Sequence, residues 1–147
     1  MSINVFSEGQ DFHFFADRYR ELYPDDVLTL DRDVVTGQDV TAMVEQLAAA
    51  NQHPMLVCQR VDGLQAPLVT NVFASRTRLA RLLGVEQQQL HETFQTRANA
   101  PVKPRVVSNG PITDEVIEGD AVDLALLPMI QHFETDRAPY ITNAIIV

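Results

Sequence analysis

The first part of the chain shows apolar residues at the spacing of an amphipathic helix. Between residues 11 and 23 they recur every three or four positions, which places them on one helical face. They are Phe12, Phe15, Tyr19 and Leu22. Pro24 follows, and proline has no backbone N–H with which to continue a helix. The pattern therefore predicts a helix that ends before Pro24.

A second helical pattern follows a short apolar run at residues 27–30. Thr36 precedes this pattern, and its hydroxyl can accept a hydrogen bond from a free N–H group at a helix start. Asp39, three positions further on, can return the bond as in a capping box. We therefore expect a helix capped by Thr36. Its apolar positions are Val40, Met43, Val44, Leu47 and Ala48.

The middle of the chain indicates a hairpin followed by a helix. Residues 55–61 and 67–73 are rich in β-branched and other apolar side chains and flank an Asp-Gly pair at 62–63, which favours a tight turn. Ser75 can cap the next helix, and Gly84 can adopt the left-handed conformation that ends it.

The character of the sequence changes near residues 100–104. Before that point helices predominate, with a last one indicated by Leu90 and Phe94. After it, short apolar pieces alternate with turn-forming residues, a texture typical of strands and turns. We expect an α+β fold, with an N-terminal α/β domain over residues 1–104 and a second unit that begins at residue 105.

The chain ends in a strongly apolar strand pattern at residues 140–147. Such a strand expects neighbours on both sides, and burial of each large aliphatic side chain contributes roughly 1.5 to 3 kcal/mol. We therefore expect the sequence to be the first part of a longer protein. The alternative is a C-terminal strand that ends inside a sheet.

Composition narrows the class of protein. With 46% apolar and 21% charged residues, the chain has the balance of a folded globular protein. A net charge of -9 opposes binding to nucleic acid, which depends on clustered Lys and Arg. We expect no signal peptide and no membrane span. A single cysteine, Cys58, excludes an internal disulfide and favours a cytoplasmic location.

A few individual residues are candidates for chemistry. His132 and Asp136 are four positions apart and could bind a metal on a helical face, but the nearby prolines favour a loop-fixing hydrogen bond or a surface role. Arg76, Arg78 and Arg81 could bind an anion near a helix start, although a solvated face or an interdomain salt-bridge surface is the expected role. Cys58 is expected to be a buried, inert thiol.

Three stretches carry a resemblance to a known family, in the same order and at similar spacing. The first runs from Pro67 to Val85 and combines a strand, a turn at Ser75-Arg76 and a helix. The second is Pro101-Val102-Lys103-Pro104-Arg105-Val106-Val107. The third joins Gly119-Asp120, Val122-Asp123-Leu124, Leu127-Pro128, His132-Phe133, Asp136 and Pro139-Tyr140-Ile141-Thr142. Together they resemble the N-terminal region of the UbiD-like decarboxylases.

The resemblance implies an enzyme that uses prenylated FMN, a divalent metal (Mn or Mg) and potassium to remove carboxylate from an aromatic or α,β-unsaturated acid. Residues from 105 onward would begin the split β-barrel that surrounds the flavin. Thr142 and Asn143 would lie nearest the cofactor, and Asp136 and Tyr140 would shape its rim. The family's catalytic residues and most cofactor ligands lie downstream, so we assign no catalytic or metal-binding residue here.

The resemblance also implies partners and leaves an alternative open. The full-length enzyme would bind a small carboxylic acid, receive its cofactor from a flavin prenyltransferase and form a homo-oligomer, whereas this fragment alone would be inactive and retain no cofactor. Thr135, Arg137 and Ala138 stand where the family's loop is commonly glycine-rich, so the substrate subfamily stays open. The alternative is a standalone, non-catalytic module that binds a protein or a small ligand.

Overall fold

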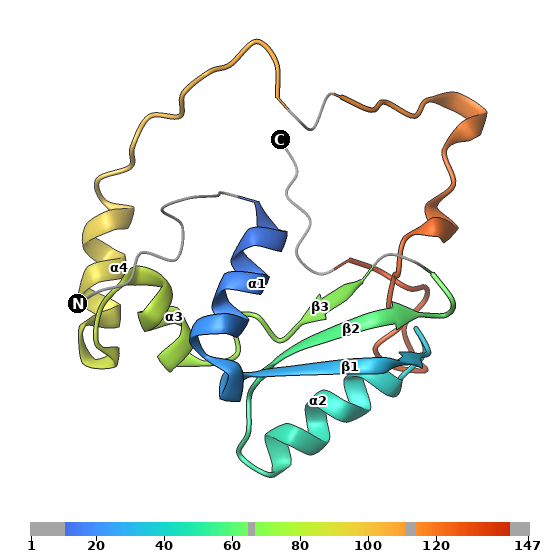
Figure 1. Cartoon of the computed structure of the whole chain (residues 1–147), viewed down its shortest axis with the longest axis horizontal. Coiled ribbons are helices and arrows are strands. Elements are labelled where there is room, and N and C mark those ends of the chain that lie inside the picture. Colours follow the sequence, from blue (N-terminus) through green and yellow to red (C-terminus); the bar gives the residue numbers. More distant parts are fainter. Residues whose placement is uncertain (1–10, 65–66, 111–113, 142–147) are drawn as a thin grey trace.

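The computed structural model describes residues 11–64, 67–110 and 114–141. It places a small sheet between helices and a long, extended segment beyond them (Figure 1). The elements are α1 (Phe12–Leu22), β1 (Val27–Val34), α2 (Asp39–Ala49), β2 (Met55–Val61), β3 (Leu68–Thr70), α3 (Arg76–Leu83) and α4 (Leu90–Ala98). Among these helices, none is long and apolar enough to cross a membrane.

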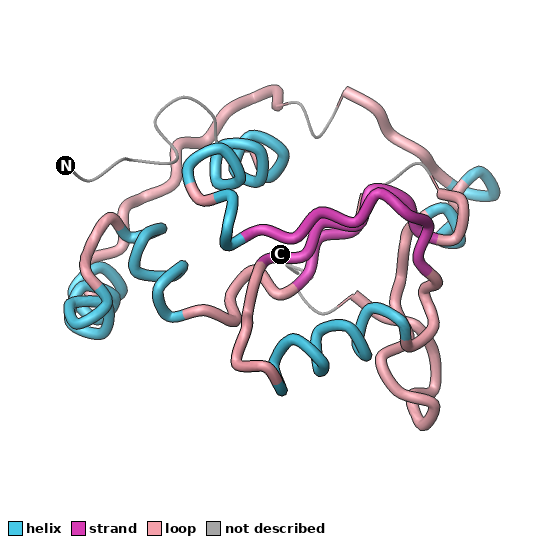
Figure 2. Tube along the Cα trace, turned by 60° about the horizontal axis from the view of Figure 1, so that its bottom comes forward, coloured by secondary structure: helices cyan, strands magenta, loops and turns pink. Residues whose placement is uncertain are grey.

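The sheet has three strands in the order β1-β2-β3. β2 pairs in parallel with β1 and antiparallel with β3. The first four residues of β2, Met55 to Cys58, are all buried, as expected for a central strand that is covered on both faces. Figure 2 shows α1 and α2 on opposite faces of the sheet, so each face has its own helical cover.

Two apolar clusters correspond to these two faces. On one face, Phe15 and Tyr19 of α1 pack with Met55 and Val57 of β2. On the other face, Val40 of α2 packs with buried residues of β1 and β2 and with one residue from much later in the chain. These residues are Val34, Cys58, Val61 and Ile130. Met43 and Leu47 of α2 are only half-buried. The two predicted stripes are confirmed in part: Phe15, Tyr19 and Val40 are buried, whereas Phe12 and Ala48 are exposed.

Local turn and cap chemistry agrees with the sequence in several places. Ser75 accepts a hydrogen bond from the backbone N–H of Arg78, 3.2 Å away, and so caps α3. Gly84 ends α3 in the left-handed conformation at φ 70. Asp62 and Gly63 both have positive φ, which a two-residue hairpin turn requires. The predicted hairpin is confirmed, although β3 is shorter than the apolar run that predicted it.

The predicted cap at Thr36 is wrong. Gln38 occupies the N-cap position of α2 and makes no side-chain capping bond. The backbone N–H and the hydroxyl of Thr36 instead both donate to the carboxylate of Asp62. The physical reason is tertiary: parallel pairing of β1 and β2 brings the end of β1 beside the turn after β2, so a carboxylate remote in sequence replaces the helix start as the partner of Thr36.

The strand-rich texture expected after residue 105 is also not observed in the residues described there. These form extended segments and two short 3₁₀ helices, Gly119–Ala121 and Leu124–Leu126, with one isolated bridge between Ile130 and Tyr140. Strands need neighbouring strands, and this segment has none within the described chain. The accessible surface is 11414 Å², whereas a compact monomer of this mass exposes about 7500 Å².

Candidate functional site

Two of the four predicted site residues lie in a loop that returns to the first part of the molecule. Asp136 and Tyr140 follow Ile130, whose side chain is only 5% exposed and belongs to the cluster on the α2 face of the sheet. Thr142 and Asn143 lie outside the described residues. The structure therefore places the loop that leads to them, and it does so through contacts with the sheet and α2.

Backbone hydrogen bonds fix both ends of this loop. The N–H of Gln131 donates to the carbonyl of Thr36 at 3.0 Å, which joins the loop to the segment between β1 and α2. The N–H of Tyr140 donates to the carbonyl of Ile130 at 3.0 Å, which closes the loop on itself. Because Ile130 is part of the buried core, this hydrogen bond also holds the backbone of Tyr140 close to the core.

Asp136 stabilises the interior of the loop. Its carboxylate accepts the backbone N–H of Phe133 at 2.9 Å, and its carbonyl accepts the side-chain amide of Gln131 at 3.1 Å. His132 makes a separate bond, 2.8 Å long, between its Nδ1 and the Thr41 hydroxyl of α2. His132 and Asp136 therefore each have a loop-fixing or anchoring hydrogen bond, which confirms the structural interpretation of this pair.

A hollow of about 390 Å³ separates the loop from α2. Thr41 and Glu45 line it from the helix, and His132 and Glu134 line it from the loop. The ring of His132 also lies 5.2 Å from that of Tyr140. His132 thus contacts both α2 and the residue that leads into the predicted cofactor strand.

The described residues show hydrogen bonds that position the loop rather than a cluster of metal-ligating side chains. The carboxylate of Asp136 already accepts a backbone N–H. In residues 11–64, 67–110 and 114–141, no cluster of three His, Cys, Asp or Glu side chains has the geometry to hold a metal ion. We therefore assign to these residues a role in positioning the loop and derive no chemical step through a cofactor.

Arg78 forms the most buried polar site in the described chain, and the sequence did not predict it. Its side chain is fully buried, and its Nη2 and Nε donate to the two carboxylate oxygens of Asp26 at 2.8 and 3.2 Å. Further guanidinium N–H groups donate to the carbonyls of His53 at 2.6 Å and of Asn71 at 2.6 Å. The expectation of a solvated or interdomain role is therefore wrong for Arg78.

The location of Asp26 explains this burial. Asp26 precedes β1, His53 precedes β2 and Asn71 follows β3. Because β3 runs antiparallel to β2, all three residues lie at the same end of the sheet. Arg78 ties these three chain segments together. The only sequence signal was an arginine three residues after the Ser75 cap, and it does not specify a partner 52 positions away.

Two aromatic residues and a second arginine complete this network. The hydroxyl of Tyr19 donates to Asp26 at 2.6 Å, and Arg81 forms an ion pair with Asp26 at 3.2 Å. The Arg81 guanidinium also lies 4.1 Å from the centre of the Tyr23 ring, a cation–π contact. Burial raises the pKa of Asp26, but hydrogen bonds from Arg78 and Tyr19 and the arginine charges outweigh it and hold that pKa below its usual value.

Cys58 is fully buried in the central strand. Burial raises the pKa of its thiol above the ordinary value, more strongly than the nearby charge of Arg32 lowers it. A raised pKa keeps the group as the weakly nucleophilic thiol at neutral pH. The predicted burial of Cys58 is confirmed, and the raised pKa is what an unreactive thiol requires.

The arrangement of these elements is shared with solved enzymes. An evolved dimeric form of the UbiD-class enzyme HmfF from Pelotomaculum thermopropionicum, in complex with prFMN, matches with a TM-score of 0.72. The match covers 84% of this chain and 29% of that one at 24% identity. A structure of HmfF with FMN matches equally well, over 27% of its chain. The chain therefore has the fold of the corresponding region of a UbiD-class enzyme.

Family profiles match along most of the sequence. Residues 23–98 match the 3-octaprenyl-4-hydroxybenzoate carboxy-lyase N-terminal domain, and residues 105–147 match the Rift-related domain of the same carboxy-lyase. The first match alone spans more than half of the chain. This chain belongs to the UbiD carboxy-lyase family.

Curated relatives are similar over part of their length. Anhydromevalonate phosphate decarboxylase from Methanosarcina mazei is 39% identical over 102 residues, which cover 69% of this chain and 23% of the relative. Phenolic acid decarboxylase from Sedimentibacter hydroxybenzoicus is 30% identical over 110 residues, which cover 68% of this chain and 23% of that relative. The chain thus spans about a quarter of the length of the curated relatives that it matches.

Proposed function

We propose that this chain is the N-terminal part of a decarboxylase that removes carboxylate, without oxidation, from an aromatic or α,β-unsaturated acid. The observation that carries the proposal is the match to two successive domains of one carboxy-lyase family in their expected order. Relatives that share this region are decarboxylases of a phenolic acid and of an anhydromevalonate phosphate. Their different substrates leave open which acid the enzyme uses.

The proposed cofactor of the whole enzyme is prenylated FMN, with a divalent metal (Mn or Mg) and potassium. The HmfF structures that share the fold hold prFMN or FMN, which supports a flavin. When bound, prenylated FMN would supply the electron sink that allows the carboxylate to leave as CO₂. A flavin prenyltransferase would deliver it, and the enzyme would be a cytoplasmic homo-oligomer.

Within that enzyme, we propose a positioning role for the described loop. Residues 1–104 would be the N-terminal α/β domain, and residues from 105 onward would begin a split β-barrel. Ile130 is anchored in the core, and the N–H of Tyr140 bonds to its carbonyl. Thr142 and Asn143 would then lie nearest the flavin, with Asp136 and Tyr140 at its rim.

The test compares the 147-residue chain with the full reading frame that contains it. Each is co-expressed with a flavin prenyltransferase, purified and examined by absorption spectroscopy for bound flavin. CO₂ release is then measured from a panel of phenolic, cinnamic and phosphorylated unsaturated acids. We expect bound prenylated FMN and turnover of at least one acid only with the full reading frame.

Two results contradict the proposal. If the full reading frame retains no flavin and releases no CO₂ from any acid, the standalone module becomes the better description of the protein. If the 147-residue chain alone binds flavin stoichiometrically, its residues hold the cofactor themselves, and a role limited to positioning the loop is contradicted.

A further inference from the structure

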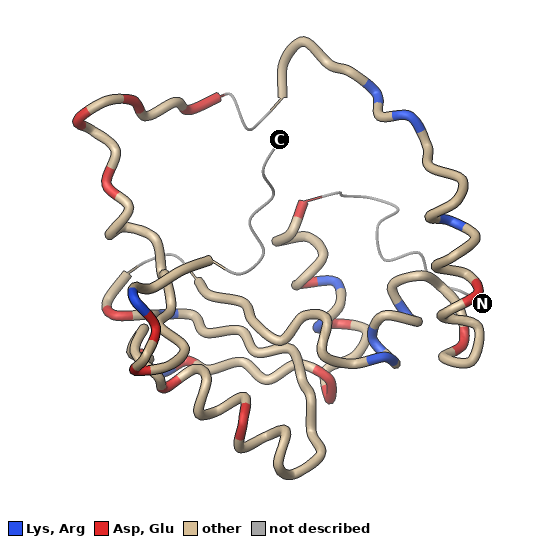
Figure 3. The backbone as a smooth tube through the Cα atoms, turned by 180° about the vertical axis from the view of Figure 1, so that it is seen from behind, with Lys and Arg blue, Asp and Glu red and all other residues tan. Residues whose placement is uncertain are grey.

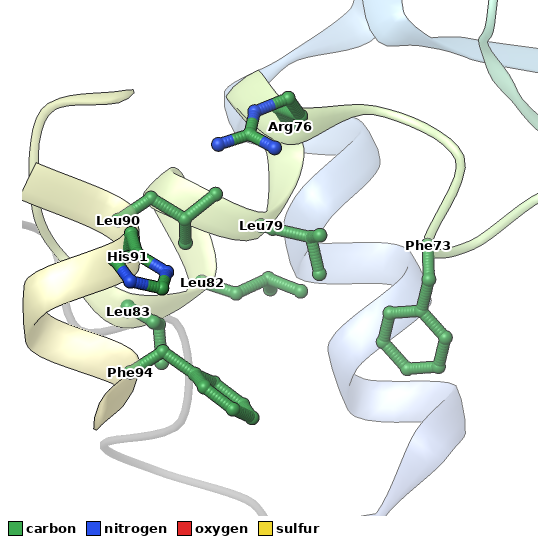
Figure 4. A pocket seen from close by; sticks show the side chains of 8 residues that line it. All are labelled: Phe73, Arg76, Leu79, Leu82, Leu83, Leu90, His91 and Phe94. Carbon is green, nitrogen blue, oxygen red and sulfur yellow. The ribbon is translucent and has the colours of Figure 1, made fainter. Parts of the chain in front are cut away.

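A second hollow lies between α3 and α4, remote in sequence from the loop at 130–141. It encloses about 370 Å³, within the size range of small-molecule pockets. Figure 4 shows the apolar side chains around it, together with Arg76 and His91. The apolar lining consists of Phe73, Leu79, Leu82, Leu83, Leu90 and Phe94. Phe73 and Phe94 are 66% and 60% exposed, so the hollow opens to solvent.

The polar lining is confined to Arg76 and His91. Arg76 is the first residue of α3, where the partial positive charge of a helix start disfavours a cation. Within the part of the chain that the structure describes, the side chain of Arg76 makes no hydrogen bond and no ion pair. Arg78 and Arg81 on the same helix are both paired with Asp26. Arg76 is thus an uncompensated cation at the edge of an apolar pocket.

The stretch of sequence that contains α3 and α4 has a net charge opposite in sign to that of the whole chain. Residues 76–105 contain six of the 11 Lys and Arg residues but only two of the 20 Asp and Glu residues. Figure 3 shows these basic positions along α3, α4 and the segment that follows. No Asp or Glu lines the pocket. An anion is therefore attracted to this side of an otherwise acidic protein.

We propose that this pocket binds a small amphipathic carboxylate, a compound with an apolar body and one carboxylate group. The apolar body would occupy the space between the leucines of α3 and the side chains of Leu90 and Phe94. The carboxylate would pair with the guanidinium of Arg76, and His91 would offer a ring nitrogen as a further hydrogen-bond donor. The proposal does not depend on the proposed decarboxylase activity, because it concerns binding to described residues only.

The test uses two probes with the same apolar body, 4-phenylbutyrate and 4-phenylbutan-1-ol. Each is titrated into the ¹⁵N-labelled 147-residue chain, and amide shifts are followed by NMR. We expect both probes to shift the amides of Leu79, Leu83 and Phe94. The carboxylate should bind roughly two- to fivefold more tightly than the alcohol, the preference that one exposed ion pair supports.

Three variants separate the pocket from general hydrophobic binding. Arg76→Gln should reduce the preference for the carboxylate to about one, whereas Arg137→Gln should preserve it, because Arg137 is exposed but lies outside the pocket. Leu83→Trp should fill the pocket and abolish binding of both probes. Amide spectra of each variant without probe show whether the fold is retained.

The proposal is overturned if neither probe shifts the amides around the pocket. It is also overturned if the two probes bind equally to the unmodified chain, or if Arg76→Gln leaves the preference for the carboxylate unchanged while the fold is intact.

Discussion

Residues 11–98 and residues 99–141 differ in how far their apolar side chains are buried. The first region contains the sheet, the four α-helices and nearly all of the buried side chains. In the second region, as far as the structure describes it, Ile130 is the one buried apolar residue. Val102 and Val106 are 92% and 91% exposed. Both regions have apolar sequences, but among the described residues of the second region only Ile130 has a buried apolar side chain.

The difference shows that apolar content alone does not make a core. In the first region, β2 supplies buried residues to both faces, and a helix covers each face. The described part of the second region has short apolar pieces that, apart from Ile130, are not covered by the sheet or its helices. We therefore expect the stability of the chain to depend on the first region and on the single anchor at Ile130.

The largest expected effect is the loss of Arg78. Arg78→Ala should lower the free energy of unfolding by about 3 to 5 kcal/mol, because it leaves Asp26 and several carbonyls at the end of the sheet without their buried partner. Urea unfolding monitored by circular dichroism measures the change. Arg76→Ala is the matched control and should change stability by under about 0.5 kcal/mol. Similar losses in the two variants would contradict the assigned network.

A comparable truncation in each region tests the contrast directly. Met55→Ala, at a fully buried position of β2, should cost about 2 to 5 kcal/mol. Leu126→Ala, at a side chain that is 62% exposed, should cost under about 0.5 kcal/mol. Urea midpoints for both variants provide the measurement. A large loss for Leu126→Ala would mean that the second region contributes to the core in solution.

Acid should weaken the first region through Asp26. Its pKa is lowered in the folded protein, so the stability it contributes is present above its unfolded value of about 3.9 and is lost as the pH falls through the folded value. Unfolding midpoints between pH 6 and pH 3 should therefore decline less steeply in Asp26→Asn, which is also less stable at neutral pH. Parallel curves for the two proteins would contradict the role of Asp26.

The smallest expected effect concerns the joint between the regions. Thr41→Val removes the hydroxyl that bonds to His132 and should cost about 0.5 to 1.5 kcal/mol. Because the loop at 130–141 is anchored there, hydrogen exchange at the N–H of Tyr140 should accelerate. Glu134→Gln, an exposed change in the same loop, is the control. Unchanged exchange in Thr41→Val would show that Ile130 alone holds the loop.

The sequence alone determined features that depend on neighbours close along the chain. Helix α3 begins after Ser75 and ends at Gly84, because a cap and a left-handed residue act within one helical turn. The Asp-Gly pair at 62–63 specified its turn for the same reason. The family was also recognisable, because motifs in a fixed order are themselves a sequence property.

The tertiary structure decided the features that depend on distant partners. Thr36 bonds to Asp62 rather than to α2, Arg78 is buried against Asp26, and Ile130 fills the core beneath α2. Each partner lies at least 26 positions away. The free energy of a hydrogen bond or an apolar contact depends on which groups the fold brings together and removes from water, and a local pattern does not contain that information.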